Sequence, residues 1–365
     1  METANPAMVT LARESRTLTQ ADLAAQLDIT QGALSKIENG QLVPSHEVVA
    51  KMAAVLNYPE SFFYQAGDYR NLPITFYRKR ARVPSLTIKA VRARTQIMRM
   101  HVGALLRSAD IPPLRVPFMD VREWRGDIGG IAAEVRTQWH LPPGPIASMM
   151  RSIEDAGIVV MRCDLGTTQV DALSTYEHDG LPPIIFVNPG APGDRLRFSL
   201  AHELAHIILH HHLIVPSEED TETQADTFAA EFLMPRRDIR AHLPAKINIQ
   251  SLAQLKTHWR VSIQALITRC RSLDRISERY ARTLYAQMNK YGYLRAEPIP
   301  VAVEEPALMR ELIEFHEKDL AYGRQDLARL LHLHPSELRS LHLGEKVVEL
   351  RSVTTVAARR PGVAR

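Results

Sequence analysis

The sequence predicts a predominantly helical α+β protein with a small all-α domain first, then a domain with a small, mostly antiparallel sheet, then helical C-terminal segments. Three observations support this. Helix-capping and turn signals alternate through residues 7–63. Short apolar stretches with strand character occur between residues 157 and 188. The stretch FSLAHELAHIILHHH, residues 198–212, places five histidines and one glutamate in an apolar helical pattern.

Composition excludes several classes of protein. A chain of 365 residues with 45% hydrophobic and 24% charged residues is typical of two or three globular domains. The only cysteines are Cys163 and Cys270, which lie far apart in the chain. We therefore expect no structural disulfide, and we expect the protein to be located in a reducing cytoplasm. We find no signal-peptide pattern and no apolar stretch near the roughly 18 residues of a membrane-spanning helix. The net charge of +4 says little about partners by itself.

Residues 1–67 are expected to form the first domain. Thr19 followed by Asp22 predicts the start of one helix, and Thr30 predicts the start of a second helix that Gly40 ends. Two short helices joined by a tight turn can place the second in the major groove of DNA. Its outward face carries the expected DNA-binding residues, with glutamine suited to adenine and lysine to guanine: Gln31, Gly32, Ser35 and Lys36.

The words TQADLA and ITQGALSKIENG make residues 9–63 resemble the XRE-type helix-turn-helix domain shared with phage lambda-like repressors. That resemblance implies a double-stranded DNA operator as partner, and a homodimer, since such repressors usually bind paired half-sites. It also implies that Gln20 and Asn39 contact phosphates and that Arg13 pairs with Glu38 inside the fold. A helical bundle that binds no DNA is the alternative, because pattern alone does not separate the two.

Residues 68–117 are expected to form a basic linker helix. Between Arg70 and Arg107 there are ten Lys or Arg residues and no acid, and apolar residues from Leu86 to Leu105 follow a helical period. Such a helix can extend the phosphate contacts, serve as a linker with a solvated basic face, or pair two subunits.

Residues 118–238 are expected to form the third unit. Residues 127–139 and 145–156 have amphipathic helical patterns, and GIVVMRCDL, VDALSTYEHDG and PPIIFVN contain the strands. A turn at residues 192–194, with Asp194 as the expected cap, precedes the histidine-rich helix.

That helix contains the H-E-x-x-H pattern. His202 and His206 lie four residues apart and therefore one turn apart on one face, where both imidazoles can reach one cation. In this arrangement two neutral imidazoles bind zinc and the adjacent glutamate, Glu203, accepts a proton from the attacking water. His210 lies one turn further on the same face, in reach of a hydrogen bond near the metal.

A third ligand is needed, and two candidates stand out. His212 has the spacing of metzincins, but Leu209 stands where that pattern needs a glycine. Glu222 in ETQADTFAAEFLMP is preferred, with Asp226 on the same face to hydrogen-bond the far nitrogen of a ligand histidine. Three other carboxylates remain weaker alternatives as ligands: Glu218, Glu219 and Glu231.

Together, HELAHIILH and ETQADTFAAEFLMP make residues 118–293 resemble the ImmA/IrrE family of zinc metallopeptidases. The resemblance implies that His202, His206 and Glu222 bind Zn²⁺ or another divalent ion, Glu203 is the general base and Asp226 orients a ligand. Members of this family cleave transcriptional repressors in response to stress or mobile-element signals. The implied function is a DNA-binding regulator that cuts a repressor-type protein or itself. A structural zinc site, or a domain that only senses a ligand or partner, is the alternative.

The remaining residues are expected to be mostly helical. Residues 239–295 are expected to form a bundle with the peptidase domain, and residues 296–365 a C-terminal segment. Two further stretches have a helix-turn-helix pattern: SLAQLKTHWRVSIQALITRC and DLARLLHLHPSELRSLHLG. Neither has clear polar residues for reading DNA bases, so we expect both to have a packing role. We expect EPIPVAVEEPA to be a linker and the tail AARRPGVAR to be disordered. The helices within residues 307–350 are expected to form a dimer or partner surface.

Overall fold

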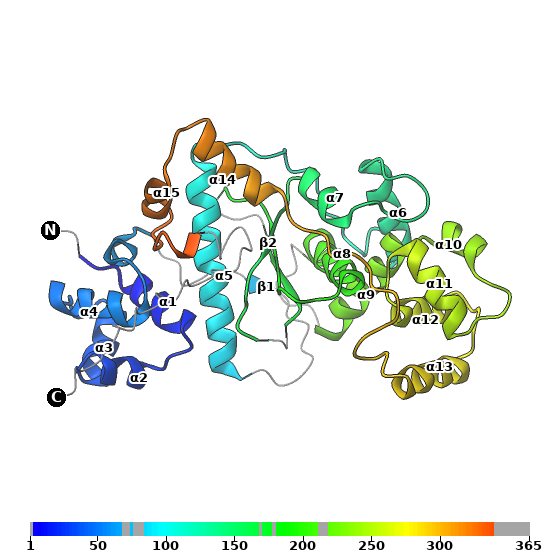
Figure 1. Cartoon of the computed structure of the whole chain (residues 1–365), viewed down its shortest axis with the longest axis horizontal. Coiled ribbons are helices and arrows are strands. Elements are labelled where there is room, and N and C mark those ends of the chain that lie inside the picture. The colour runs from blue at the N-terminus through cyan, green and yellow to red at the C-terminus, as the bar shows by residue number, and fades with distance from the viewer. Residues whose placement is uncertain are drawn as a thin grey trace, which may run out of the picture.

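The computed structural model describes residues 3–67, 74–75, 84–167, 170–176, 180–210 and 218–338. The molecule is elongated: the N-terminal helices lie at one end, a small sheet lies in the middle, and helices α10 to α13 lie at the other end (Figure 1). This mostly helical arrangement with a small mixed sheet confirms the predicted fold class. Among the described helices, none has the length and apolarity needed to cross a bilayer.

The N-terminal domain is a bundle of five short helices. Thr19 caps α2 in a reciprocal capping box with Asp22, and Thr30 accepts a hydrogen bond from the Ala33 amide at the start of α3, as the sequence predicted. Gly40 follows α3 with φ of +74°, a left-handed conformation that glycine adopts without steric cost. The elements are α1 (Pro6–Ser15), α2 (Gln20–Gln26), α3 (Gln31–Glu38), α4 (His46–Leu56) and a 3₁₀ helix (Glu60–Tyr64).

The sheet has four strands in the order β1-β3-β4-β2. Strand β3 is antiparallel to both of its neighbours, and β2 is parallel to β4. Three of the strands, β2, β3 and β4, have four residues each, are buried at nearly every position, and match the short apolar stretches of the sequence. The strands are β1 (Ile74–Thr75), β2 (Val159–Arg162), β3 (Ala172–Thr175) and β4 (Ile184–Val187).

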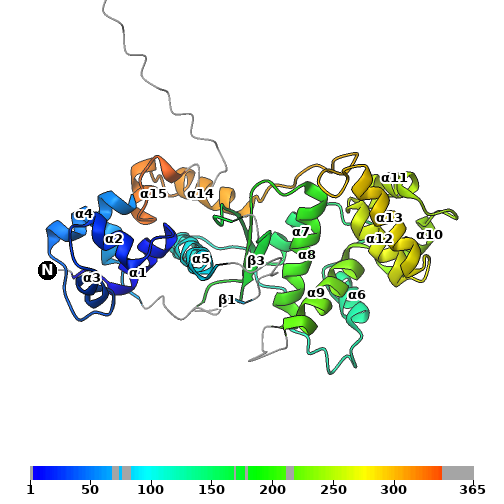
Figure 2. The same cartoon turned by 90° about the horizontal axis from the view of Figure 1, so that it is seen from below.

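Helices cover both faces of this sheet. Successive side chains of a strand point to opposite faces, and both faces carry apolar side chains that need to be buried. On one face Val160, Ile185 and Ala172 pack in the core that contains helix α8 (Gly193–Leu209). On the other face Val159 and Phe186 pack with α5 (Ser85–Leu106) and α14 (Leu308–Lys318). Figure 2 shows the sheet between α5 and α8.

Helix α5 joins the N-terminal domain to the sheet. Ala93 and Ile97 belong to the core of the N-terminal domain, whereas Val91 and Val102 belong to the core against the sheet. Arg99 is 2% exposed and donates a hydrogen bond of 2.7 Å to Thr175 Oγ1 of β3. The helix therefore connects the two cores as a linker does, but Arg99 lies in the interior and is not part of a solvated basic face.

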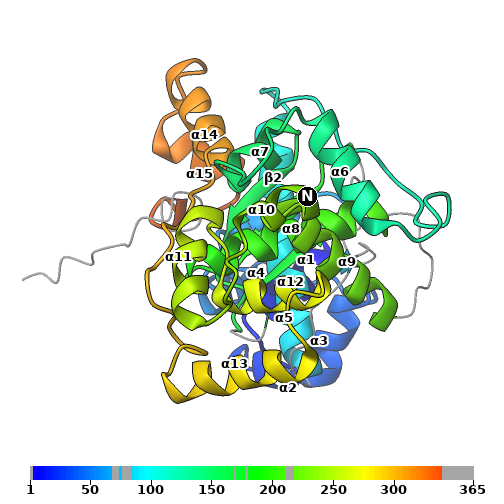
Figure 3. The ribbon, with the colours of Figure 1, turned by 90° about the vertical axis from the view of Figure 1, so that its right-hand side faces the viewer.

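Helices α7 and α9 pack against the histidine-rich helix α8, and a separate group of helices follows at the far end of the molecule (Figure 1). Helices α6 (Ile128–Gln138) and α7 (Met149–Asp155) lie within the two predicted amphipathic stretches, and α9 (Glu218–Leu233) packs along α8. Figure 3 views the molecule from the end where the helical bundle lies. The bundle consists of α10 (Arg236–His242), α11 (Ile249–Trp259), α12 (Ile263–Ser272) and α13 (Glu278–Lys290).

Residues 296–306 have no helix or strand, but they are docked rather than free. Glu297 accepts hydrogen bonds at the start of α12, and Glu304 forms an ion pair with buried Arg197 of α8. The expected linker segment is therefore anchored to the fold, because its acidic residues pair with buried cations. Helix α15 (Arg324–Leu330) follows α14, and the expected disordered tail lies outside the described residues.

Candidate metal centre and DNA-binding surface

Helix α8 is buried on every side along its second half, as its continuous apolar pattern predicted. His202, Glu203, His206 and His210 are each 2% exposed or less. Buried ionisable side chains are costly unless they are paired or bind an ion. Asp194, the expected cap, lies instead in the first turn of a helix that begins at Gly193, and its carboxylate bonds Lys256 at 2.5 Å.

Two histidines of α8 and one glutamate of α9 converge. The Nε2 atoms of His202 and His206 lie 3.1 Å apart, and the Glu222 carboxylate lies 3.4 Å from the first and 3.3 Å from the second. Donors placed 2.0–2.1 Å from a tetrahedral zinc ion are separated by about 3.3–3.4 Å. The three groups thus have both the chemistry and the mutual spacing of a zinc site.

Helix α9 packs along α8 and brings Glu222 to this position, and its buried residues include two alanines. Ala225 and Ala229 are fully buried, so the backbones of α8 and α9 can approach closely. Glu222 lies at the edge of that contact, with a side chain that is 29% exposed. One side of the three-residue group is therefore buried in the helix pair, while Glu222 reaches the surface.

Each histidine uses its other ring nitrogen within the protein. Asp226 Oδ1 lies 2.9 Å from His202 Nδ1, and His210 Nδ1 lies 2.9 Å from His206 Nδ1. His210 in turn reaches Gln224 of α9 at 3.0 Å through Nε2. Such outer contacts fix the ring orientation and the tautomer of a ligand histidine. Both Nε2 atoms therefore face the same point.

The protonation of this group follows from burial and from the two carboxylates. Burial disfavours charged His202, but hydrogen bonds with Asp226 and Glu222 outweigh it and raise the pKa of His202 to about 9. Burial lowers the pKa of His206 and of His210 to about 4. Burial also opposes ionisation of Glu222, but its contacts with the two histidines prevail and lower its pKa to about 2. Without a metal ion, a proton on His202 supplies the positive charge that these carboxylates require.

Glu203 points to the sheet side of α8. Ser174 of β3 donates a hydrogen bond of 2.8 Å to Glu203 Oε2. Ser174 shares the α8-facing side of β3 with Ala172, as the alternation of a strand requires. Neither Ser174 nor Gln224 was singled out from the sequence, because both contacts depend on a tertiary arrangement that no local pattern encodes.

The other carboxylates considered as ligands are not part of this group. Glu231 accepts a hydrogen bond of 2.8 Å from the Arg236 amide and forms an ion pair with Arg269, so its role is structural and the ligand alternative was wrong. His212 and the side chains of Glu218 and Glu219 lie outside the described residues.

The expected DNA-binding residues lie on α2, on α3 and directly after α3. Gln31, Gly32, Lys36 and Asn39 are exposed, and Gln20 and Ser35 are half-buried. A side chain added at Gly32 would meet no atom within 4 Å, so that position is open.

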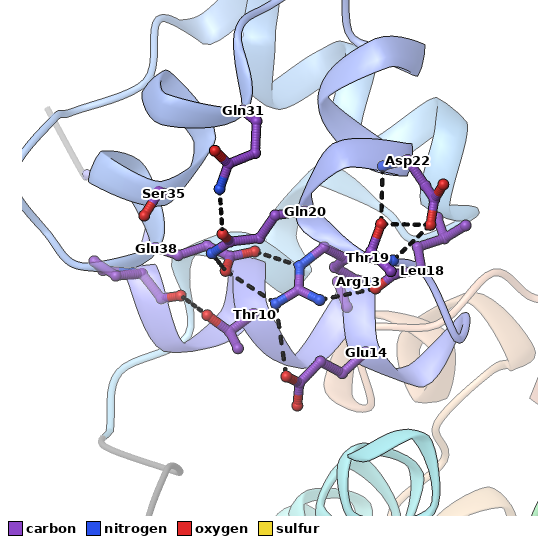
Figure 4. A network of polar contacts seen from close by, with 12 residues as sticks. Thr10, Arg13, Glu14, Leu18, Thr19, Gln20, Asp22, Gln31, Ser35 and Glu38 are labelled. Carbon is purple, nitrogen blue, oxygen red and sulfur yellow. Dashed lines mark hydrogen bonds and ion pairs between the residues drawn. The ribbon is translucent and has the colours of Figure 1, made fainter. Parts of the chain in front are cut away.

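A chain of hydrogen bonds orders two of these side chains (Figure 4). Arg13 donates to Glu38 through Nε at 2.6 Å and through Nη2 at 2.9 Å, as implied for this pair. Gln20 donates to the same carboxylate at 2.7 Å, and Gln31 donates to Gln20 at 2.8 Å. A buried ion pair thus orients the amides of Gln20 and Gln31 through a chain of hydrogen bonds.

Comparison with known protein families agrees with this geometry. Residues 10–63 match the helix-turn-helix family, and residues 153–271 match the IrrE N-terminal-like domain of the M78 peptidases. The chain therefore carries an XRE-type DNA-binding domain followed by a metallopeptidase-like domain that contains the His202, His206 and Glu222 group. No curated protein matches the chain.

Proposed function

We propose that this chain, in which a helix-turn-helix DNA-binding domain precedes an M78 metallopeptidase-like domain, is a transcriptional regulator with a zinc-dependent endopeptidase activity. The observation that carries the proposal is the group of three donor atoms from His202, His206 and Glu222 within 4.8 Å of one another, and Glu203 follows His202 directly in the chain. A purely structural zinc site usually fills its positions with cysteine or histidine and needs no adjacent carboxylate.

In this proposal the residues divide the work as follows. His202, His206 and Glu222 hold the ion, while Asp226 and His210 fix the two imidazole rings. Bound zinc would act as a Lewis acid that polarises the peptide carbonyl and lowers the pKa of the attacking water. Glu203 accepts the proton of that water and delivers it to the leaving amine. Ser174 donates a hydrogen bond to one oxygen of Glu203 and so fixes the position of this carboxylate.

The N-terminal domain directs this activity to a gene. Gln31 and Lys36 would contact bases, Gly32 and Ser35 would lie against the groove, and Gln20 and Asn39 would contact phosphates. The substrate in this proposal is a repressor-type protein or the chain itself. Cleavage is triggered by a stress or mobile-element signal. The active form is a homodimer that binds paired half-sites. Two buried free cysteines suit the reducing cytoplasm.

The substitution Glu203→Gln tests the enzymatic part. The variant should keep zinc and DNA binding, lose peptide hydrolysis, and change the regulation of the target gene. Zinc content, operator binding and cleavage are measured side by side on purified wild-type and variant protein. Regulation that stays the same in cells carrying either form would remove proteolysis from the function.

A non-enzymatic regulator is the second candidate, and one cavity favours it. A space of about 220 Å³ lies between the DNA-binding domain, α5 and the residues after β2, lined among others by Arg16, Tyr58, Arg94 and Cys163. A small molecule bound there would touch both domains and could shift the operator affinity without proteolysis. Under this candidate, the Glu203→Gln variant regulates as the wild type does.

A further inference from the structure

The positive charge of the chain is concentrated in helices α10 to α13. Residues 236–295 contain thirteen Lys or Arg and three Asp or Glu, a net charge of +10 in a chain whose total net charge is +4. The remainder of the chain is therefore net negative. Two of the thirteen cations, Lys256 and Arg269, are buried and paired with carboxylates, and the other eleven are exposed. This end of the molecule is thus a strongly basic unit.

The N-terminal domain, in contrast, has little of the positive charge that DNA binding needs. Residues 1–67 contain four Lys or Arg and seven Asp or Glu, so the domain has a net charge of −3. Arg13 is buried in its pair with Glu38, and Lys36 is the only Lys or Arg on α2 or α3. Cations that neutralise phosphates supply most of the sequence-independent affinity for DNA. That affinity should therefore depend on cations elsewhere in the chain.

Helix α5 is basic as well, but two of its arginines serve the interior. Arg94 donates a hydrogen bond of 2.8 Å to the carbonyl oxygen of Ser15, and Arg99 is buried against β3. Groups that are bonded inside the fold are not available to phosphates. The exposed cations of helices α10 to α13 are therefore the larger reserve of positive charge among the described helices.

Helix α13 presents a basic face to solvent. Arg279, Arg282 and Lys290 are exposed, and the period of an α-helix places all three on one side. The residues that pack α13 into the bundle lie on the opposite side: Ala281, Leu284 and Met288. From residue 279 to residue 290 the helix rises about 16 Å, which is close to the length of about five nucleotides of one DNA strand. The three cations therefore have a spacing that suits several successive phosphates.

Little negative charge opposes this face. Glu278 is the only carboxylate on α13, and it pairs with Arg282 at 3.4 Å and with Arg271 at 2.9 Å. All three of these side chains are largely exposed, so the pairs are weak and can open to a phosphate. In the described part of the chain, neither Arg279 nor Lys290 is held in an ion pair. The face is therefore open to an external anion.

We propose that this face of α13, formed by Arg279, Arg282 and Lys290, binds the phosphates of duplex DNA without reading its sequence. Duplex DNA is the polyanion that the proposed function already brings to this protein, and guanidinium groups match phosphate with two parallel hydrogen bonds. Helix α13 lies along the same edge of the elongated molecule as α2 and α3, at the opposite end (Figure 1 and Figure 3). The inference rests on the DNA-binding part of the proposed function and does not depend on peptidase activity.

The salt dependence of DNA binding tests this face. The full-length protein with Arg279→Gln, Arg282→Gln and Lys290→Gln is titrated with a fluorescent duplex of random sequence at salt concentrations from about 50 to about 200 mM. Each lost phosphate contact lowers the slope of log affinity against log salt by about 0.9, so we expect a slope that is less steep by about 2–3. Over this range of salt, the wild type should lose about 40-fold more affinity than the variant.

A triple substitution on α10 is the matched control. Arg236→Gln, Arg237→Gln and Arg240→Gln remove the same charge from the same group of helices. Helix α10 lies away from α13, at the other edge of this end of the molecule (Figure 1). We therefore expect the control to keep the wild-type slope. Because all six side chains are exposed, both variants should also keep the wild-type melting temperature.

Three results would overturn the proposal. The first is an α13 variant that keeps the wild-type slope. The second is an equal loss of affinity in both triple variants, because the net charge would then matter and the face would not. The third is polyglutamate that binds the wild type as tightly as duplex DNA and is released by the same three substitutions, because the face would then fit an acidic polypeptide.

The outcome is separate from base reading by the N-terminal domain. If a preferred site is selected from random DNA, the α13 variant should weaken binding to that site and to random DNA by similar factors. If the α13 variant changes the slope as expected but no preferred site emerges, the α13 face stands as a DNA contact and the operator-binding part of the proposed function fails.

Discussion

Asp226 offers the sharpest single test of how the protein prepares a metal site. Its carboxylate lies 2.9 Å from His202 Nδ1 and holds the ring so that Nε2 faces His206 and Glu222. Outer-shell partners of this kind contribute about 10–100-fold to metal affinity. The Asp226 side chain is 44% exposed, so water can replace part of its hydrogen bonding. We therefore expect Asp226→Asn to weaken zinc binding by about tenfold, or about 1.4 kcal/mol.

The assay is competition for zinc against a chromophoric chelator, with the purified wild-type and variant proteins. Asp274→Asn is the control, because this exposed aspartate follows α12 at a distance from the histidines and its loss should not change zinc affinity. An Asp226→Asn protein that binds zinc as tightly as the wild type would refute the reasoning that this carboxylate orients a ligand.

Three other outcomes follow from the structure. The pKa of His202 is raised to about 9, so zinc must displace a proton from this side chain at neutral pH. The apparent zinc affinity should therefore fall by about tenfold for each pH unit between pH 8 and pH 6. A zinc affinity that does not change with pH would contradict this. Lys256→Met leaves two carboxylates buried without their cation, so it should lower the free energy of unfolding by about 3–5 kcal/mol in denaturant titrations. The control is Lys290→Met, which changes an exposed lysine and should have little effect. A protein with both Gln31→Ala and Lys36→Ala should bind its preferred site, selected from random DNA, with a lower ratio of specific to non-specific affinity, by at least about tenfold. The control Lys51→Ala on α4 should leave that ratio unchanged.

Local sequence patterns predicted the helices that carry the site, because the relevant signals are short-range. Thr19 and Thr30 start their helices through their own hydroxyl groups, and the four-residue spacing of His202 and His206 places both rings on one face. Glu222 was preferred over His212 from a missing glycine, and the structure brings it within 3.4 Å of both histidines.

Contacts between distant segments could not be predicted in the same way. The basic composition of residues 70–107 suggested solvent or phosphate, yet Arg99 is buried against β3 and Arg94 donates to the carbonyl of Ser15. Glu297 and Glu304 lie in a stretch with the composition of a linker, and their roles depend on cations 41 and 107 residues away in the chain. Composition reports what a side chain is, whereas burial and pairing depend on the tertiary arrangement.

The most direct test of the account is diffraction from crystals grown with zinc, recorded at the zinc absorption edge. We expect one anomalous peak about 2.0–2.2 Å from Nε2 of His202, from Nε2 of His206 and from the Glu222 carboxylate. Anomalous density elsewhere, with no peak between these three side chains, would contradict the central claim.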